Sequence, residues 1–307
     1  MSKLAAISSK PNVHAYAQGA AMRNIQPVAS FIAPPVEVAT SVGRFKQYTE
    51  KSRFRIPETA RAVGGNATRL GYTASDATYN CGAHALDFPV DKLEQLEASE
   101  LENMLMEAAD EIAAVAGLAH EKKVVDLALA TVGAGTTLSV GSSDDVIDQL
   151  DQKILAVIKA AKYGSLMGIG VLMGANFWRQ AKNHASVRSR YVSGGKSQFA
   201  VPDLNDFGSL LISKPDVRLS MMVYDDAVEG KAEDIQFVLD TACLIFARME
   251  TPNRRDPSFM KTFRLRGQWM VPGAYETEDG RSDVAKMDWS EDVQATNSAA
   301  AARLNVS

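Results

Sequence analysis

The stretch "SELENMLMEAADEIAAVAGLAHEKKVVDLALA", residues 99–130, decides the architecture of this chain. Its apolar residues recur at spacings of three and four, which predicts one face of an amphipathic helix. That face consists of Leu101, Met104, Leu105, Ala108, Ile112, Val115 and Ala119. Ser99 followed by Glu102 predicts a capping box, and Gly117 permits a bend because it weakens a helix by about 1 kcal/mol relative to Ala. A continuous helix over 100–130 would be roughly 45 Å long, which is unusual in a compact domain.

The charges around this helix are divided unevenly. Fifteen Asp or Glu residues lie between Asp87 and Asp151, against three lysines. Upstream, residues 44–69 carry seven Lys or Arg residues against Glu50 and Glu58. Two solvated faces would explain this division. The alternative is that the basic segment of one copy lies over the acidic region of the next.

The basic segment itself is patterned like a β-hairpin. "RFRI" (53–56) and "TRLGYT" (68–73) are strand-like runs, and Gly64-Gly65-Asn66 between them predicts a turn. A lone two-stranded ribbon is only marginally stable in water. We therefore expect the ribbon to pack on a neighbouring copy of the same chain.

The other segments predict a mixed α/β chain with extended ends. Residues 1–30 predict an arm, and Pro34-Pro35 an extended backbone. Helices are predicted from Ser143 or Asp144 onward, over "NFWRQAKNH" (176–184), and over "PDLNDFGSLL" (202–211) with Asp203 as the cap. Strands are predicted over "LMGIGVLMG" (166–174), "VRLSMMVY" (217–224) and "QFVLDTACLIFAR" (236–248). "TFRLRGQWMV" (262–271) and "DVAKMDWS" (283–290) bracket a hairpin turn at Asp279-Gly280, and residues 294–307 read as a disordered or weakly helical tail.

Composition limits the classes of protein to consider. The chain has 307 residues, 46% of them hydrophobic, and a formal net charge of -4, which argues against a protein that coats nucleic acid. Cys81 and Cys243 stand far apart and predict two inert thiols in a reducing compartment. No apolar run reaches the roughly 20 residues that span a bilayer, and we expect no signal peptide and no membrane partner.

Signals for catalysis are weak. Gly195-Lys196-Ser197 ends like a phosphate-binding loop, but Arg190 stands where that loop needs glycine. We expect Gly168, Gly170 and Gly174 to allow close backbone packing. The histidines (His14, His84, His120 and His184) show no metal-ligand spacing. Asp144-Asp145 and Asp225-Asp226 read as caps and turns. We predict no catalytic residue, no cofactor and no metal, and hence not an enzyme.

Several segments together resemble a known family. "FIAPPVEVATSVGRFKQYTEKSRFRIPETARAVGG" (31–65) resembles an arm that leads into an extended loop, and "LDFPVDKLEQLEASELENMLMEAADEIAAVAGLAHEKK" (86–123) resembles the start of a spine helix. "NFWRQAKNHASVRSRY" (176–191) resembles a Trp-containing helix after a central strand, and "PSFMKTFRLRGQWMVPGAYETEDGRSDVAKMDWSE" (257–291) resembles closing strands. From about residue 31 to 289, the chain resembles major capsid proteins of tailed double-stranded DNA bacteriophages, whose fold is shared by herpesvirus capsid floors and encapsulins.

The resemblance implies an α+β fold with five parts. These are an N-terminal arm (1–43), an extended β-hairpin loop (44–83), a peripheral domain with a long spine helix (84–140 and 255–295), an axial α/β domain (141–254) and a C-terminal tail (296–307). It also implies a structural protein that assembles through hexamers and pentamers into an icosahedral shell enclosing viral double-stranded DNA, without sequence-specific binding. The expected location is the virion capsid, assembled in the host cytoplasm.

The resemblance further implies partners and an interface. Because only 30 to 40 residues precede the family-like region, we expect a separate scaffolding protein, with a portal and cement proteins as further partners. We place Arg53, Arg55 and Arg61 at a subunit interface. Lys46 and Lys51 are available in the loop, but we predict no cross-link. Two alternatives remain open, namely an encapsulin-like compartment and a cytoplasmic α/β enzyme that binds a phosphorylated ligand at Gly195-Lys196-Ser197.

Overall fold

The structure is a computed structural model in which the chain forms two compact units. It describes residues 27–47, 59–61, 63–69, 75–93, 101–139, 141, 144–161, 168–193, 202–228, 230–249, 251–254 and 256–306. The first unit comprises residues 1–43, 79–126 and 262–294, and the second comprises residues 44–78, 127–261 and 295–307. The two units are defined by contacts within one copy of the chain and do not test the five predicted parts. The boundaries of those parts stay a prediction.

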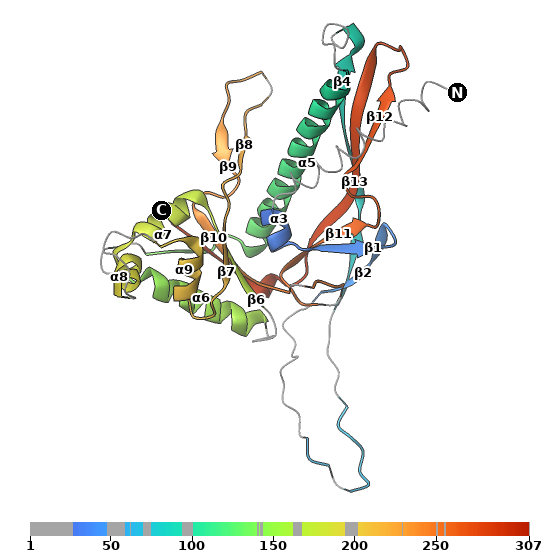
Figure 1. Cartoon of the computed structure of the whole chain (residues 1–307). Coiled ribbons are helices and arrows are strands. Elements are labelled where there is room, and N and C mark those ends of the chain that lie inside the picture. The colour runs from blue at the N-terminus through green and yellow to red at the C-terminus, as the bar shows by residue number, and fades with distance from the viewer. Residues whose placement is uncertain are drawn as a thin grey trace. The chain divides into compact units, whose positions relative to one another are not determined.

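The first unit is built on a five-stranded sheet (Figure 1). Its strands are β1 (Pro35–Val38), β4 (Gly82–Asp91), β11 (Met260–Leu265), β12 (Val271–Glu276) and β13 (Ser282–Ala295). The long strand β13 pairs antiparallel with both β12 and β4, and β1 runs parallel to β11. The hairpin predicted at Asp279-Gly280 is confirmed as the turn between β12 and β13. There Gly280 takes a φ of 70°, a conformation that glycine adopts without strain.

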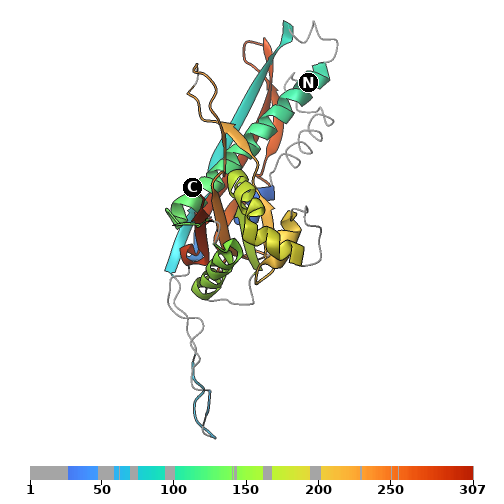
Figure 2. The same cartoon turned by 90° about the vertical axis from the view of Figure 1, so that its left-hand side faces the viewer.

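Two helices complete this unit. Helix α5 (Leu101–Val132) is continuous through Gly117, so the predicted long helix is confirmed, and its residues up to Asp126 belong to this unit. Figures 1 and 2 both show it running alongside β4 and β13. Helix α3 (Pro27–Ile32) forms where the sequence predicts the end of an arm, because Phe31 and Ile32 bury their side chains. Residues 1–26 and the predicted capping residue Ser99 lie outside the described residues.

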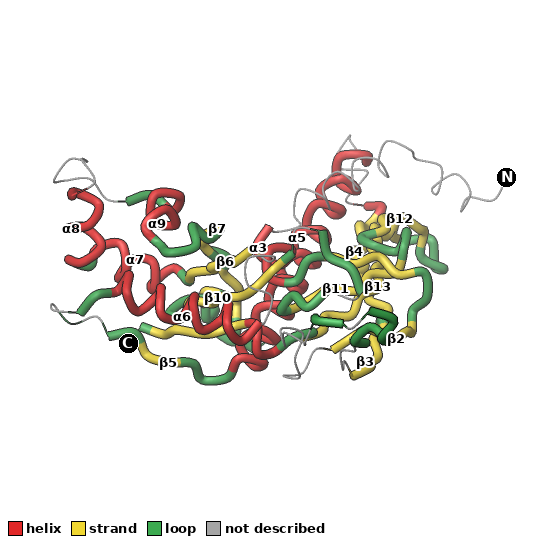
Figure 3. The backbone as a smooth tube through the Cα atoms, turned by 90° about the horizontal axis from the view of Figure 1, so that it is seen from below, coloured by secondary structure: helices red, strands yellow, loops and turns green. Residues whose placement is uncertain are grey.

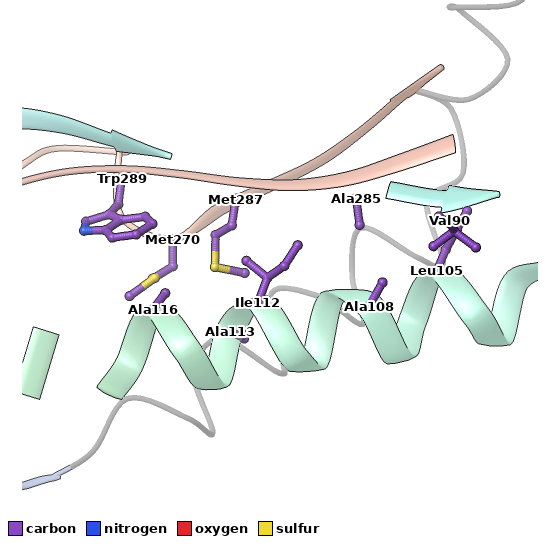
Figure 4. Close-up of a cluster of buried hydrophobic side chains, with 10 residues drawn as sticks. All are labelled: Val90, Leu105, Ala108, Ile112, Ala113, Ala116, Met270, Ala285, Met287 and Trp289. Atoms are coloured by element: carbon purple, nitrogen blue, oxygen red, sulfur yellow. The ribbon is translucent and has the colours of Figure 1, made fainter. Parts of the chain in front are cut away.

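The core of the first unit lies between α5 and the sheet (Figure 4). Five buried helix residues form the apolar stripe of α5: Leu105, Ala108, Ile112, Ala113 and Ala116. They pack against strand residues that include Ala285, Met287 and Trp289. The predicted face was wrong at its far end, since Val115 is 50% exposed and Ala119 is exposed. The stripe follows the 3.6-residue period through Ala116 instead, so it reaches His120.

The second unit is a mixed sheet with helices packed on it (Figure 3). The strand order is β5 (Thr136–Thr137), β14 (Ala301–Asn305), β10 (Ala242–Arg248), β6 (Gly168–Met173) and β7 (Asp216–Leu219). Residues 242–247 of β10 are all buried, which explains their continuous apolar run. Helix α6 (Val146–Ala161) packs on β10 and β14, and α9 (Leu204–Leu210) packs on β7. Helices α7 (Ala175–Asn183) and α8 (Ala185–Ser193) pack on each other, and Trp178 of α7 meets Phe207 of α9 edge-on.

Two strand predictions were wrong in extent. The alternating run 217–224 divides into β7 and β8 (Val223–Asp225), because the chain leaves the sheet after Ser220, whose backbone N–H still donates to Met173 of β6. The run 236–248 likewise divides into β9 (Ile235–Phe237) and β10. Strands β8 and β9 form a separate two-stranded sheet, as do β2 (Val42–Gln47) and β3 (Ser75–Asn80). The hydrophobic pattern of the sequence continues across both breaks, so it could not predict where the strands end.

The expectation of a disordered or weakly helical C-terminal tail was also wrong. After a short 3₁₀ turn (Ser298–Ala300), β14 pairs antiparallel with β10 and parallel with β5. Ala300, Leu304 and Val306 are buried at even positions, which is a strand pattern. The alanine run hid this alternation, since alanine favours helices locally, whereas pairing with β10 depends on residues some 60 positions earlier.

Removing volume from the apolar stripe should destabilise the first unit. We expect Ile112→Ala to lower the free energy of unfolding by about 2–4 kcal/mol, because Ile112 is buried between α5 and the sheet. The matched control is Val115→Ala, one turn along the same helix but half exposed, which should change it by less than about 0.5 kcal/mol. Urea unfolding of the unassembled subunit measures both, and equal effects would contradict the observed stripe.

Candidate functional site

The predicted interface residues lie in the segment between β2 and β3. Arg53 and Arg55 lie outside the described residues. Arg61 is described and exposed. The turn predicted at Gly64 is confirmed, since Gly64 has a φ of 83° and follows the fully exposed Val63. The interface role of all three arginines stays a prediction.

The β2–β3 ribbon forms the base of this segment. At one end, the Cys81 backbone N–H donates to the Ser41 carbonyl. At the other end, the Ser75 side-chain hydroxyl donates to the Gln47 carbonyl. The two strands therefore run in opposite directions. Lys46 and Asp76 add an ion pair of 2.6 Å across the ribbon. Both side chains are about half exposed, so this pair contributes little to stability.

Tyr79 anchors the end of the ribbon that lies in the first unit. Its side chain is fully buried and stacks on Phe263 of β11 at 4.7 Å between ring centroids. Its hydroxyl lies 3.4 Å from that of Thr40. Gly43 packs so closely on this ring that a Cβ would overlap it. The Asn80 backbone N–H donates to Asp292 of β13 at 2.8 Å. The root of the segment is therefore held in a fixed geometry.

A cluster of buried charges lies beside α5, and we call it the His120 cluster. It consists of His120, Arg264, Trp269 and Glu291, with Lys123 at its margin. His120 Nδ1 lies 2.7 Å from Glu291 Oε2, and Arg264 Nη2 lies 3.3 Å from His120 Nε2. The Arg264 guanidinium also covers the Trp269 ring at 3.3 Å. The cluster thus joins α5 to β11 and β13 through charged contacts.

Basic neighbours stabilise the charged form of Glu291 in this cluster. Burial alone would raise the pKa of Glu291, but its pairing with His120 and Lys123 outweighs burial and lowers that pKa to about 2. Burial lowers the pKa of Arg264 to about 10, and the nearby Glu291 charge opposes this shift. Sequence reasoning missed the cluster. The available signal was His120, which continues the 3.6-residue stripe one turn after Ala116.

Glu121, the next residue on α5, behaves differently. It is 1% exposed, and neither carboxylate oxygen has a hydrogen-bond partner among the described residues. Burial therefore raises the pKa of Glu121 to about 7. A carboxyl group in such surroundings is favoured in its neutral form.

A second buried polar cluster, the Lys261 cluster, lies in the second unit. It comprises Asp256, Ser258, Lys261, Thr296 and Asn297. Lys261 donates to the Asp256 carbonyl at 2.6 Å and pairs with its carboxylate at 3.1 Å. Thr296 donates to the Ser258 carbonyl, and Asn297 donates to that of Pro257 at 3.1 Å. Burial lowers the pKa of Lys261, and Asp256 opposes this shift. The cluster fastens the start of the C-terminal segment to the loop before β11.

The weak catalytic signals have structural explanations where they are described. Gly174 packs against the Asp240 backbone so closely that a Cβ would overlap it, which confirms the predicted close approach. Asp145 accepts from the Ile147 and Asp148 N–H groups and caps α6, whereas Asp144 accepts from Gly141. The interpretation of Asp144-Asp145 as a cap is therefore confirmed for Asp145, whereas Ser143 or Asp144, from which the helix was predicted, lies one or two positions before the observed cap. Asp225 closes a turn by accepting from Ala227 and Asp234, as predicted.

The remaining candidates have structural surroundings where the structure describes them. Cys81 and Cys243 are buried free thiols, and burial raises the pKa of both. His84 stacks on Trp289, and His184 caps the end of α7 and contacts Ser186. Gly195-Lys196-Ser197 and His14 lie outside the described residues. Within the described ranges, no group of His, Cys, Asp or Glu has the arrangement of a metal site, and no helix is long and apolar enough to cross a membrane.

Comparisons with known proteins locate this fold. No protein-family model and no curated protein matches the chain. A phage-related protein from Bordetella bronchiseptica RB50 is 14% identical, with a TM-score of 0.72 over 96% of both chains. The mature capsid of bacteriophage PhiM1 is 10% identical, with a TM-score of 0.57 over 92% of this chain and 87% of that one. The SrpI encapsulin of Synechococcus elongatus PCC 7942 is 10% identical, with a TM-score of 0.54 over 92% and 88%. The fold class predicted from the sequence is confirmed.

Glu121 should make the subunit less stable as pH rises. The pKa of Glu121 is about 7 in the folded state, against an ordinary value of 4.5. The free energy of unfolding therefore falls as the pH rises from 4.5 to 7, by up to about 3 kcal/mol. We expect Glu121→Gln to raise the free energy of unfolding above wild type at pH 8, and to raise it much less at pH 5. Urea unfolding at both pH values checks this. Glu111→Gln, exposed on the same helix, is the control. A Glu121→Gln effect that is equal at both pH values would contradict the expectation.

Proposed function

We propose that this chain, which has the fold of bacteriophage capsid and encapsulin shell proteins, is a major capsid protein that assembles into an icosahedral shell around viral double-stranded DNA. The observation that carries the proposal is the extent of the likeness, which covers about nine tenths of both chains in the PhiM1 comparison. A shared core alone would cover less.

The segment between β2 and β3 supports assembly through a neighbouring copy. It holds most of the seven basic residues of positions 44–69, and its root is fixed by Tyr79. Its described part, residues 59–61 and 63–69, contains neither helix nor strand and is exposed. A polar, basic segment of this length gains little from its own chain. A neighbouring acidic surface would stabilise it, and α5 lies in the acidic region of the sequence.

The overall charge favours a container. A net charge of -4 leaves the protein without the basic excess of a DNA-coating protein, so the genome can be enclosed without tight binding of every subunit. We also propose assembly in the host cytoplasm through hexamers and pentamers, helped by a separate scaffolding protein. A portal and cement proteins would complete the virion. The PhiM1 capsid and the SrpI encapsulin, which share this fold, are shells, which favours a structural protein over an enzyme.

The second candidate is an encapsulin-like compartment, because the SrpI encapsulin and a virus-like particle from Pyrococcus furiosus have the same fold. The contents of the particle distinguish the two functions. We expect negative-stain electron microscopy of the chain, expressed alone and with its neighbouring genes, to find closed particles. Nuclease-protected DNA inside them would support the capsid, and a protein cargo would support the compartment. A stable monomer or dimer in both expressions would contradict both functions.

The interface prediction for the three arginines has a sharp test. We expect Arg53→Glu/Arg55→Glu/Arg61→Glu to reduce particle yield at least about tenfold, because like charges across an interface repel. The subunit should remain folded by circular dichroism. The matched control is Arg53→Lys/Arg55→Lys/Arg61→Lys, which keeps the charges and should still assemble. Normal particles from the Glu variant would remove the electrostatic part of the interface.

A further inference from the structure

The β8–β9 hairpin is a two-stranded sheet of the second unit that pairs with no third strand among the described residues. Val223 lies opposite Phe237, and Asp225 lies opposite Ile235. One more backbone hydrogen bond, from Val238 to Met222 at 2.9 Å, extends the ladder toward the base. Figures 1 and 2 show the hairpin standing out from the sheet and helices of its own unit. An isolated ribbon of this kind is marginally stable in water.

One face of the hairpin is apolar and uncovered. Side chains alternate along a strand, so Val223 and Ile235 share a face with Phe237 and with Met221 just before β8. The exposed fractions are 66% for Met221, 45% for Val223, 58% for Ile235 and 38% for Phe237. The opposite face carries the more polar pair Tyr224 and Gln236. Four large apolar side chains gathered on one exposed face are typical of an interaction surface.

The connection between the two strands is acidic. Residues 225–234 contain five acids and the single base Lys231. Asp226, Glu233 and Asp234 are exposed. Asp225 is held in the turn by two backbone N–H groups at 2.9 Å each. The hairpin therefore presents an apolar face with a negatively charged tip.

Helices α7 and α8 of the same unit carry the complementary charge. Residues 175–193 contain Arg179, Lys182, Arg188 and Arg190 and no Asp or Glu. Arg179 and Arg188 are exposed, whereas Arg190 pairs with Asp145. No ion pair in the described part of the chain joins these bases to the hairpin, and the hairpin tip lies away from both helices in Figures 1 and 2. Within one copy, the acidic tip of the hairpin and the basic α7–α8 surface therefore form no ion pair with each other among the described residues.

We propose that the β8–β9 hairpin of one copy docks its apolar face and acidic tip on the α7–α8 surface of a second copy. The inference rests on the proposed shell function and names two surfaces that would meet within it. Because the two surfaces differ, the contact is head-to-tail. Repetition of such a contact around an axis closes a ring, in which every hairpin is covered.

The apolar part of the contact is tested by a pair of neighbouring substitutions. Under conditions in which the wild-type chain forms particles, we expect Phe237→Ser to reduce particle yield at least about tenfold. Gln236→Ser changes the adjacent, equally accessible strand position on the opposite face, so its yield should stay within about threefold of wild type. Circular dichroism and the urea midpoint of the unassembled subunits establish that both variants fold.

The charged part is tested by reversal and by mixing. Asp226→Lys/Glu233→Lys and Arg179→Glu/Arg188→Glu should each abolish association between like copies, and the quadruple variant should restore it. Mixing the two double variants should produce mixed oligomers in native mass spectrometry, because each hairpin then meets an oppositely charged helix pair on the other copy. A contact within one copy would be restored in the quadruple variant but not in the mixture.

Each outcome decides the matter. Loss of assembly in Phe237→Ser with recovery on mixing supports the docking. Equal yields from the Phe237 and Gln236 variants overturn it while the shell function stands. Loss in Phe237→Ser without any charge rescue means that another surface or another protein covers the hairpin, which overturns the assignment to α7 and α8. A wild-type chain that stays monomeric overturns the shell function itself, and the hairpin proposal with it.

Discussion

A helix in a protein gains most of its stability from packing its apolar face, and the packing of the 32-residue helix α5 organises the first unit. Helix α5 rises about 48 Å. The 14-residue strand β13 spans about 47 Å, so the two elements are of similar length. The apolar stripe of α5 then meets Ala285, Met287 and Trp289 in turn. Strands β4 and β12 pair with β13 and widen the surface that the helix covers.

Buried charges fix the places where distant segments meet. The His120 cluster joins α5 to strands more than 140 residues later in the chain, and the Lys261 cluster joins the loop before β11 to the start of the C-terminal segment. Burying charges costs desolvation energy, so such clusters contribute more to a unique arrangement than to raw stability. Glu121 illustrates this desolvation cost, since its carboxylate is buried and has no hydrogen-bond partner among the described residues.

Local patterns in the sequence correctly predicted those elements that depend on neighbouring residues alone. The helix over 100–130, the strand at 168–173 and the turn at Gly280 all follow from spacing or from residue type. The errors arose where distant residues decide. Val115 fits a three-and-four spacing but faces solvent, because the sheet lies on the side of Ala116. The final strand reads as a helix or a tail until β10 supplies its partner.

The His120 cluster could not be assembled from sequence, since its members come from three separate segments. Of the predicted interface residues, Arg53 and Arg55 lie outside the described residues and Arg61 is exposed, so their interface role stays a prediction.

The position of β14 sets an order on synthesis. In the second unit, the strand order β5-β14-β10-β6-β7 places residues 301–305 between β5 and β10, beside the fully buried core strand. A ribosome makes this segment after every other strand of the sheet, so one edge of β10 stays unpaired until about residue 305 has emerged from the exit tunnel. The sheet of this unit can therefore be completed only after residues 301–305 have been made, however early its other four strands fold.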